Sequence, residues 1–393
     1  MIIYNKEWLH NKQVAEQVQT DMREGSITPE EFAKIRAAYA FYFYLPRLVI
    51  RVGLFILTLI ILLFSGGLLS LFAAEARIID TPAYPMVLGV ICYVVLEHLV
   101  KNNRYLHSGP DNALLYVSAT LFGGGFIWTI SKMNLTFAEA SICAAFICMM
   151  CVYLTVRFAD VITALAACIS FFAFVYFTYG KVGSVGLATM PFMIMVAAGG
   201  LFYLMNRLGK DIRNINYENC IDFAKIISLI TLYAAGNYFV VNRLNNMLNN
   251  LDDSHTTIPL GFIFWIWTML VPVLYVLIGI RKKSSMFLRL GLLAAVAAVA
   301  TFRNYYHLMP IEVALTLAGA ILLAASYTVI QYLKKRPNGI TYAEPEVHSN
   351  FDKLNIEGLI VGQATSHLPN AQNHPTERFG GGSGGGGGSS GDF

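Results

Sequence analysis

The residues of this chain with the clearest chemical potential are a few ionisable side chains at the ends of apolar stretches. Arg303, Tyr306, His307 and Glu312 lie close together, on either side of a proline. A guanidinium beside aromatic rings suits a carboxylate or phosphate, so this short turn is a candidate site for an anionic ligand on the outer side of a membrane. The alternative is an interfacial anchor, in which Arg303 pairs with Glu312 within an aromatic belt.

A second candidate lies at the opposite membrane face, where Glu97 and His98 precede Lys101. Glu97 and Lys101 are one helical turn apart, which is the spacing of an ordinary ion pair on a helix surface. An ionisable group in an apolar stretch also suggests function, so a role in handling protons or substrate stays open.

The motifs of several enzyme classes are absent from the sequence. It contains no P-loop, no HExxH helix, no GxSxG elbow and no dinucleotide fingerprint. Cys148 and Cys151 share a helix face and are soft ligands of the kind that copper(I) prefers, but no histidine or carboxylate joins them, and cysteine is an ordinary apolar packing residue. We therefore predict no catalytic residue, no metal and no cofactor, and we regard enzymatic activity as uncertain and disfavoured.

Ten apolar stretches must position these groups. Hydrophobic residues make up 56% of the chain and charged residues 13%, and ~20 apolar residues cross ~30 Å of hydrocarbon. We predict an all-α fold, a polytopic bundle of about ten transmembrane helices. The predicted spans are 48–72, 83–100, 112–131, 138–156, 161–180, 185–205, 224–241, 258–280, 286–302 and 311–333.

Lysine and arginine predict the orientation of the spans, because they concentrate in cytoplasmic loops. Basic residues cluster after the second, sixth, eighth and tenth spans, and Arg157 follows the fourth, whereas the remaining turns carry one basic residue each. With an even number of spans, both termini are predicted to be cytoplasmic.

A hydrophilic segment precedes the spans. Residues 1–46 are predicted to form a cytoplasmic helical hairpin, because Gly25 is a natural helix stop and Thr28, Pro29 and Glu31 match a capping-box start. Two such short helices bury little surface alone. The hairpin is therefore expected either to pack on its own membrane domain or to dock a protein partner.

The remaining chain divides into two parts. Residues 47–336 form the predicted transmembrane domain. Residues 337–393 form a flexible cytoplasmic tail, which is rich in glycine and serine from residue 380.

Two further patterns predict local shape. In the outer loop 242–257, Leu244, Met247 and Leu251 recur at helical spacing, which predicts an amphipathic helix on the outer surface. Three consecutive glycines at 123–125 in the third span permit either close helix packing or local unwinding, as at transporter binding sites.

The N-terminal region resembles a known group of proteins. The pattern Glu24-Gly25-Ser26-Ile27-Thr28-Pro29-Glu30-Glu31, directly followed by many spans, is similar to a broad set of uncharacterised bacterial polytopic membrane proteins with a short N-terminal helical domain of unknown function. The Gly-rich tail resembles the tails of several bacterial envelope proteins. The resemblance covers roughly the first 70 residues and the general architecture. It implies a bacterial inner-membrane protein and supplies no catalytic residues.

These observations favour a non-enzymatic envelope scaffold or sensor, whose partners are the lipid bilayer and a protein at the N-terminal hairpin. The scarcity of charges inside the spans favours this function, because coupled transporters commonly carry an ionisable residue near the midplane. The alternative is a small-solute or lipid-handling permease, favoured by the interior glycines. A third class is an intramembrane enzyme acting on a lipid-linked substrate. No nucleic-acid partner is expected.

Overall fold

The protein is described by a computed structural model at residues 2–23, 26–133, 138–249 and 261–306 and at isolated positions between 313 and 331. Within these residues the ordered elements are helices, and the only β-type contact is an isolated parallel bridge between Tyr44 and Tyr105. The predicted all-α fold is confirmed.

In the described part of the chain, nine helices are long and apolar enough to cross a membrane. They are α3 (Leu48–Glu75), α4 (Ala83–Asn103), α5 (Pro110–Lys132), α6 (Glu139–Phe158), α7 (Val161–Tyr179), α8 (Ser184–Leu208), α9 (Glu218–Gly236), α11 (Gly261–Lys282) and α12 (Ser285–Tyr306). They match the first nine predicted spans, and the chain is a multi-pass membrane protein. The tenth predicted span, 311–333, and the predicted tail, 337–393, lie outside the continuously described residues.

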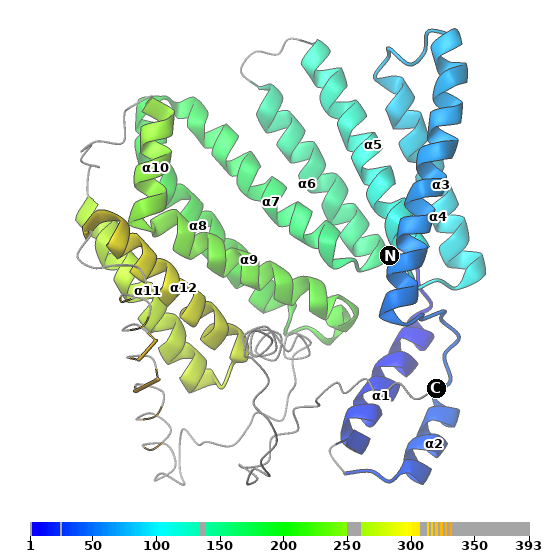
Figure 1. The fold of residues 1–393 in the computed structure, drawn as a ribbon, viewed down its shortest axis with the longest axis horizontal. Coiled ribbons are helices and arrows are strands. Elements are labelled where there is room, and N and C mark those ends of the chain that lie inside the picture. Colours follow the sequence, from blue (N-terminus) through cyan, green and yellow to red (C-terminus); the bar gives the residue numbers. More distant parts are fainter. Residues whose placement is uncertain are drawn as a thin grey trace, which may run out of the picture.

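Helices that follow one another in the sequence pack as pairs: α4 with α5, α6 with α7, α8 with α9, and α11 with α12. These pairs stand in a row, with α3 at one edge against α5 (Figure 1). One buried cluster includes Leu96 and Phe158, and a second includes Leu229 and Phe287. The bundle therefore has two cores, one on each side of α7, which packs on α6, α8 and α9.

The N-terminal hairpin consists of α1 (Lys6–Arg23) and α2 (Pro29–Ala38) and lies at one end of the bundle (Figure 1). We call this the hairpin end, and the opposite one the far end. At the start of α2, the Glu31 N–H donates to Thr28 Oγ1 at 3.3 Å and the Thr28 N–H donates to Glu31 Oε2 at 3.0 Å. The predicted capping box is thus present.

The break between the fourth and fifth spans is sharp. α6 ends at Phe158, Ala159 adopts the left-handed conformation with φ of 49°, and the Asp160 carboxylate accepts a hydrogen bond from the Thr163 N–H at 2.9 Å. A carboxylate at this position caps the first turn of the next helix. The predicted division at 157–160 is correct.

The seventh span differs from its predicted range, 224–241. It runs from Glu218 to Gly236, and α10 (Tyr238–Asn249) begins after the break. The cause is Asn237, whose Oδ1 accepts the N–H groups of Phe239 and Val240 at 3.0 and 3.3 Å, as N-cap asparagines do.

The α10 helix accounts for much of the predicted outer loop, 242–257. It is helical, as expected, but its buried positions include Val241 and Asn246, whereas Met247 is 66% exposed. The predicted helix is therefore present, but its buried face differs from the one that leucine and methionine spacing indicated. Residues 250–257 lie outside the described part.

Of the three glycines at 123–125, Gly123 and Gly125 lie against neighbouring helices, whereas a Cβ on Gly124 would meet nothing within 4 Å. α5 is continuous through them, and a Cβ at Gly125 would stand 3.0 Å from the Pro82 carbonyl oxygen. The absence of a side chain thus lets α5 approach α4 closely.

Candidate functional site

The first predicted site, near Arg303, is described only in part. Arg303 is half-buried near the end of α12, and Tyr306 is the last residue of that helix. His307, Glu312 and the Tyr306 side chain lie outside the described residues, so the Arg303–Glu312 pair stays a prediction.

The neighbouring Tyr305 does face the bundle. Its ring lies 5.0 Å from that of Tyr238 and 5.8 Å from that of Trp265, between centroids. Its hydroxyl accepts a hydrogen bond from Asn242 Nδ2 at 2.7 Å. The far end of α10, α11 and α12 is therefore an aromatic cluster of the kind found at membrane interfaces.

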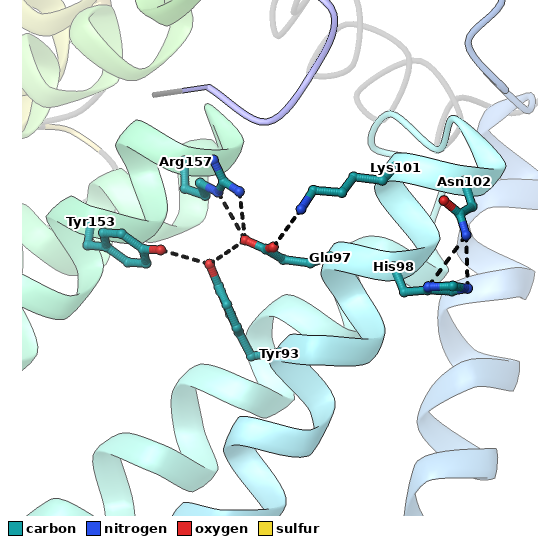
Figure 2. A network of polar contacts seen from close by, with 7 residues as sticks. All are labelled: Tyr93, Glu97, His98, Lys101, Asn102, Tyr153 and Arg157. Carbon is teal, nitrogen blue, oxygen red and sulfur yellow. Dashed lines mark hydrogen bonds and ion pairs between the residues drawn. The ribbon is translucent and has the colours of Figure 1, made fainter.

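The second predicted site, at Glu97, is a network of polar contacts (Figure 2). Glu97 Oε1 accepts from Arg157 Nη2 at 2.8 Å, from Arg157 Nε at 3.1 Å and from the Tyr93 hydroxyl at 2.8 Å. Glu97 Oε2 accepts from Lys101 Nζ at 3.1 Å. The Tyr93 and Tyr153 hydroxyls lie 2.8 Å apart.

This geometry makes Glu97 a junction between α4 and α6. The predicted pairing of Glu97 with Lys101 is present, but Arg157 is an additional partner 60 positions away in the sequence. The side chains of Glu97 and Arg157 retain only 22% and 25% exposure, so their charge-assisted hydrogen bonds are partly shielded from water. His98 points away from this network and contacts Asn102 (Figure 2).

Arg157 also holds the N-terminus. Its carbonyl oxygen lies in the last turn of α6, where helical carbonyls lack intrahelical donors. This oxygen accepts a hydrogen bond from the Ile3 N–H at 3.0 Å. One residue thus joins the Glu97 network to the start of the chain.

A second polar cluster lies at the hairpin end and contains two buried aspartates, Asp111 and Asp160, each 3% exposed. Asp111 Oδ1 accepts from the N–H groups of Ser108 and Gly109 at 2.8 and 3.0 Å. Asp160 Oδ1 accepts from the Tyr116 hydroxyl at 3.0 Å. Both carboxylates stand at helix N-termini, where backbone N–H groups and the helix dipole favour negative charge.

Two residues outside the spans complete this cluster. Tyr4 is 6% exposed, and its pKa is raised well above the usual value by burial and by the nearby Asp111 and Asp160 charges. His107 Nδ1 lies 4.0 Å from Asp160 Oδ1. Desolvation lowers the pKa of His107 although the aspartates oppose that shift, so the imidazole is neutral at pH 7.

The cluster leaves one polar atom unsatisfied. Asp111 Oδ2 is buried and has no hydrogen-bond partner among the described residues. No group of three or more metal-ligating side chains occurs in the described part of the chain. The arrangement suits a structural role, in which the two carboxylates bind N–H groups near helix starts and their charges influence the ionisation of Tyr4 and His107.

Sequence reasoning missed this cluster. Asp111 follows Gly109-Pro110 and Asp160 precedes an apolar run, and both positions are recognisable helix starts. That signal predicts the Asp160 cap, whereas Asp111 bonds back to the loop that precedes α5. It does not predict that Tyr4, more than 100 positions away from either aspartate, is buried near both of them.

An apolar groove adjoins the Glu97 network. It has a volume of about 200 Å³ and is lined by residues of α4, α5 and α6, including Val90, Tyr93, Ala119 and Tyr153. Because Tyr93 and Tyr153 belong to both features, the groove ends where the charged network begins.

Comparison of the chain with protein-family models, with curated proteins and with solved structures found no significant match.

Proposed function

We propose that this protein is a non-enzymatic scaffold or sensor of the bacterial inner membrane, whose N-terminal hairpin docks a partner protein in the cytoplasm. The observation that carries this proposal is the bond between Ile3 and Arg157. It ties the hairpin to the residue that joins α4 and α6, so a change in the spacing of these spans acts directly on the hairpin.

Further contacts make the connection rigid. The Tyr44 N–H donates to the Arg104 carbonyl at 3.1 Å, and the Arg104 guanidinium stands 4.9 Å from the centre of the Trp8 ring. Asn11 Nδ2 donates to the Ala40 carbonyl at 2.8 Å. Arg104, in the turn that follows α4, therefore contacts both the first turn of α1 and the segment that follows α2, and Asn11 joins α1 to that segment.

The outer surface of the hairpin is available to a partner. None of the residues of α2 is buried, and Lys34 and Arg36 are exposed. A helical pair that is fixed at its base and exposed on one helix suits a docking platform better than a lead-in segment that packs wholly on its own bundle.

The orientation and location belong to the same proposal. Basic residues cluster at the hairpin end, and by the positive-inside tendency this end faces the cytoplasm. The resemblance of the N-terminal region to bacterial membrane proteins supports the inner membrane. Reporter fusions at Thr20 and Lys334 are expected to read cytoplasmic, and a periplasmic reading at either position contradicts the proposed topology.

The docking function is tested by photo-crosslinking in cells. A photoreactive residue at Ala33 or Ala37, exposed positions of α2 beside Lys34 and Arg36, should capture one defined protein, and the same residue at Lys282, an exposed position of α11 at the same end, should not. Because deletion of residues 1–44 also removes buried Tyr4, the sharper variant is the double charge reversal Lys34→Glu and Arg36→Glu, which leaves the base of the hairpin intact. Capture that persists in this variant, or capture only of lipid, contradicts the proposal.

A small-solute permease is the second candidate, favoured by the unpartnered Asp111 Oδ2 in an otherwise satisfied buried cluster. Ionisable groups of this kind commonly serve ion pathways in membrane proteins. Solute flux in proteoliposomes that is unchanged in the double variant Lys34→Glu and Arg36→Glu but is lost in Asp111→Asn would favour the permease over the scaffold.

A further inference from the structure

The groove between α4, α5 and α6 is open toward the surface of the bundle. Val90 on one wall is 48% exposed and Tyr153 on the other is 52% exposed. The floor includes the small residues Ser118 and Ala119 of α5. In a multi-pass protein this outer surface of the spans adjoins the hydrocarbon of the bilayer.

The position of Gly89 explains why a hollow forms here. A Cβ on Gly89 would lie 2.8 Å from the Phe122 nitrogen and 3.0 Å from the Ser118 carbonyl oxygen. α4 and α5 are therefore in close contact at this level. Between α4 and α6 the groove remains, because the α5 residues beneath it, Ser118 and Ala119, are small.

The chemistry of the groove changes along its length. The surface that lines it is apolar, and its end toward the hairpin carries the Tyr93 and Tyr153 hydroxyls, 2.8 Å apart. One helical turn farther, Arg157 and Lys101 surround the single carboxylate of Glu97. Two cations and one anion leave one excess positive charge beside an apolar slot.

We propose that the groove binds one acyl chain of an anionic phospholipid, whose phosphate contacts Lys101 and is attracted by the nearby charge of Arg157. The groove volume of about 200 Å³ is below the ~300–1,000 Å³ of sites for drug-sized ligands, and it suits a segment of a single chain whose remainder lies in the bilayer. An apolar lining offers nothing to a sugar or a nucleotide. Arginine and lysine are the common phosphate-binding residues.

Lys101 is the accessible member of the pair. Its side chain is 55% exposed, and an ammonium group has three donors, so it can bind a phosphate while it keeps its contact with Glu97. Arg157 is committed to Glu97 by two nitrogens, and it contributes mainly its charge. This inference goes beyond the proposed docking function and does not depend on a partner at the hairpin.

The test measures lipid binding directly on the full chain. Native mass spectrometry of the purified protein compares retention of phosphatidylglycerol with that of phosphatidylcholine carrying the same acyl chains. One retained phosphatidylglycerol molecule, preferred over phosphatidylcholine, is expected. Lys101→Gln should reduce this preference by about fivefold, and Lys282→Gln, a matched exposed lysine in the last turn of α11, should leave it unchanged.

A second variant tests the groove itself. Ala119→Leu fills the floor and should abolish retention of both lipids, whereas Thr120→Leu, on the exposed side of the same helix, should not. If Ala119→Leu does not fold, phosphatidylglycerol with a photoreactive acyl chain is used on the wild-type protein, and labelling is expected in the peptides that contain Val90 or Tyr153. Equal retention of both lipids by the wild type, retention by folded Ala119→Leu, or labelling only elsewhere overturns the proposal.

Discussion

The Ile3 N–H donates a hydrogen bond to the carbonyl oxygen of Arg157 at 3.0 Å, while the guanidinium of the same arginine holds Glu97. The start of the chain is thereby fixed to a contact between α4 and α6. Any change that releases Arg157 from Glu97 should loosen the N-terminal residues, because Arg157 binds both Ile3 and Glu97.

Glu97→Gln tests this relationship. The substitution leaves the partly buried Arg157 guanidinium without its anion and should lower the stability by about 1–2 kcal/mol. Hydrogen exchange at the amide of Ile3 should increase in parallel. The control is Glu75→Gln, which changes an exposed glutamate at the far end of α3. Equal melting temperatures and equal exchange rates at Ile3 in the two variants would show that the network is not coupled to the N-terminus.

Two substitutions of Asp160 should separate the contribution of helix capping from the contribution of the negative charge. Asp160→Ala removes the cap of α7 and the acceptor of the Tyr116 hydroxyl, so a loss of about 2 kcal/mol is expected. Asp160→Asn keeps one side-chain oxygen, which can replace one of the two carboxylate oxygens that accept from the Tyr116 hydroxyl and the Thr163 N–H, and it should lose less. Chemical denaturation of the two variants ranks them, and an equal loss in Asp160→Asn and Asp160→Ala would mean that the negative charge is the essential feature.

His107 should make the protein less stable in weak acid. Desolvation lowers the pKa of this imidazole in the folded state, so the unfolded state binds the proton more readily, and stability falls as the pH drops below ~6.5. One such group contributes a slope of at most ~1.4 kcal/mol per pH unit. Its charged and polar neighbours are Asp160, Asp111, Arg51 and Asn112.

The variant that isolates this effect is His107→Asn. His107 has φ of 48°, a conformation that asparagine tolerates better than most residues. The melting temperature of the variant, followed from pH 8 to pH 5, should depend less on pH than that of the wild type. An unchanged profile would assign the acid sensitivity to other groups.

The predicted pair at the end of α12 gives a further test. If Arg303 and Glu312 neutralise each other near the outer interface, Arg303→Ala and Glu312→Gln should give the same loss of folding or function, because an unpaired guanidinium in hydrocarbon costs at least ~2.5 kcal/mol. Membrane insertion and thermal stability of both variants are the measurements. Normal insertion, folding and activity of both variants would show that this cluster only anchors the helix end at the membrane interface.

The membrane architecture was predictable because it follows from local properties. Eight spans appear within a few residues of their predicted positions, the seventh overlaps its predicted range, and the capping box at Thr28 is present, since these features depend on residues near one another in the sequence. The end of the seventh span was misplaced, because the apolar run continues through Tyr238 while one buried asparagine ends the helix at Gly236.

The candidate site was less predictable, because its contacts join distant parts of the chain. The spacing of Glu97 and Lys101 indicated their pair. Nothing in the sequence indicates that Arg157 reaches Glu97 or that Tyr4 is buried beside Asp111 and Asp160. These contacts depend on how α4, α5, α6 and α7 are arranged, which the hydropathy pattern does not determine.

The first span has a consequence for how the protein is made. None of the residues in the most apolar window of α3 is buried, and its main packing partner is α5, which is synthesised only after α4 has emerged. A span in this position must wait in lipid as an independent helix, and its uniformly apolar surface allows it to do so at no cost in exposed polar groups. Its docking depends on a loop glycine, Gly109, where a Cβ would meet the backbone of Arg51 and Phe55. α3 can therefore enter the membrane before the helices that pack on it. The N-terminal segment, by contrast, cannot reach its final place until α6 and α7 have entered the membrane as well.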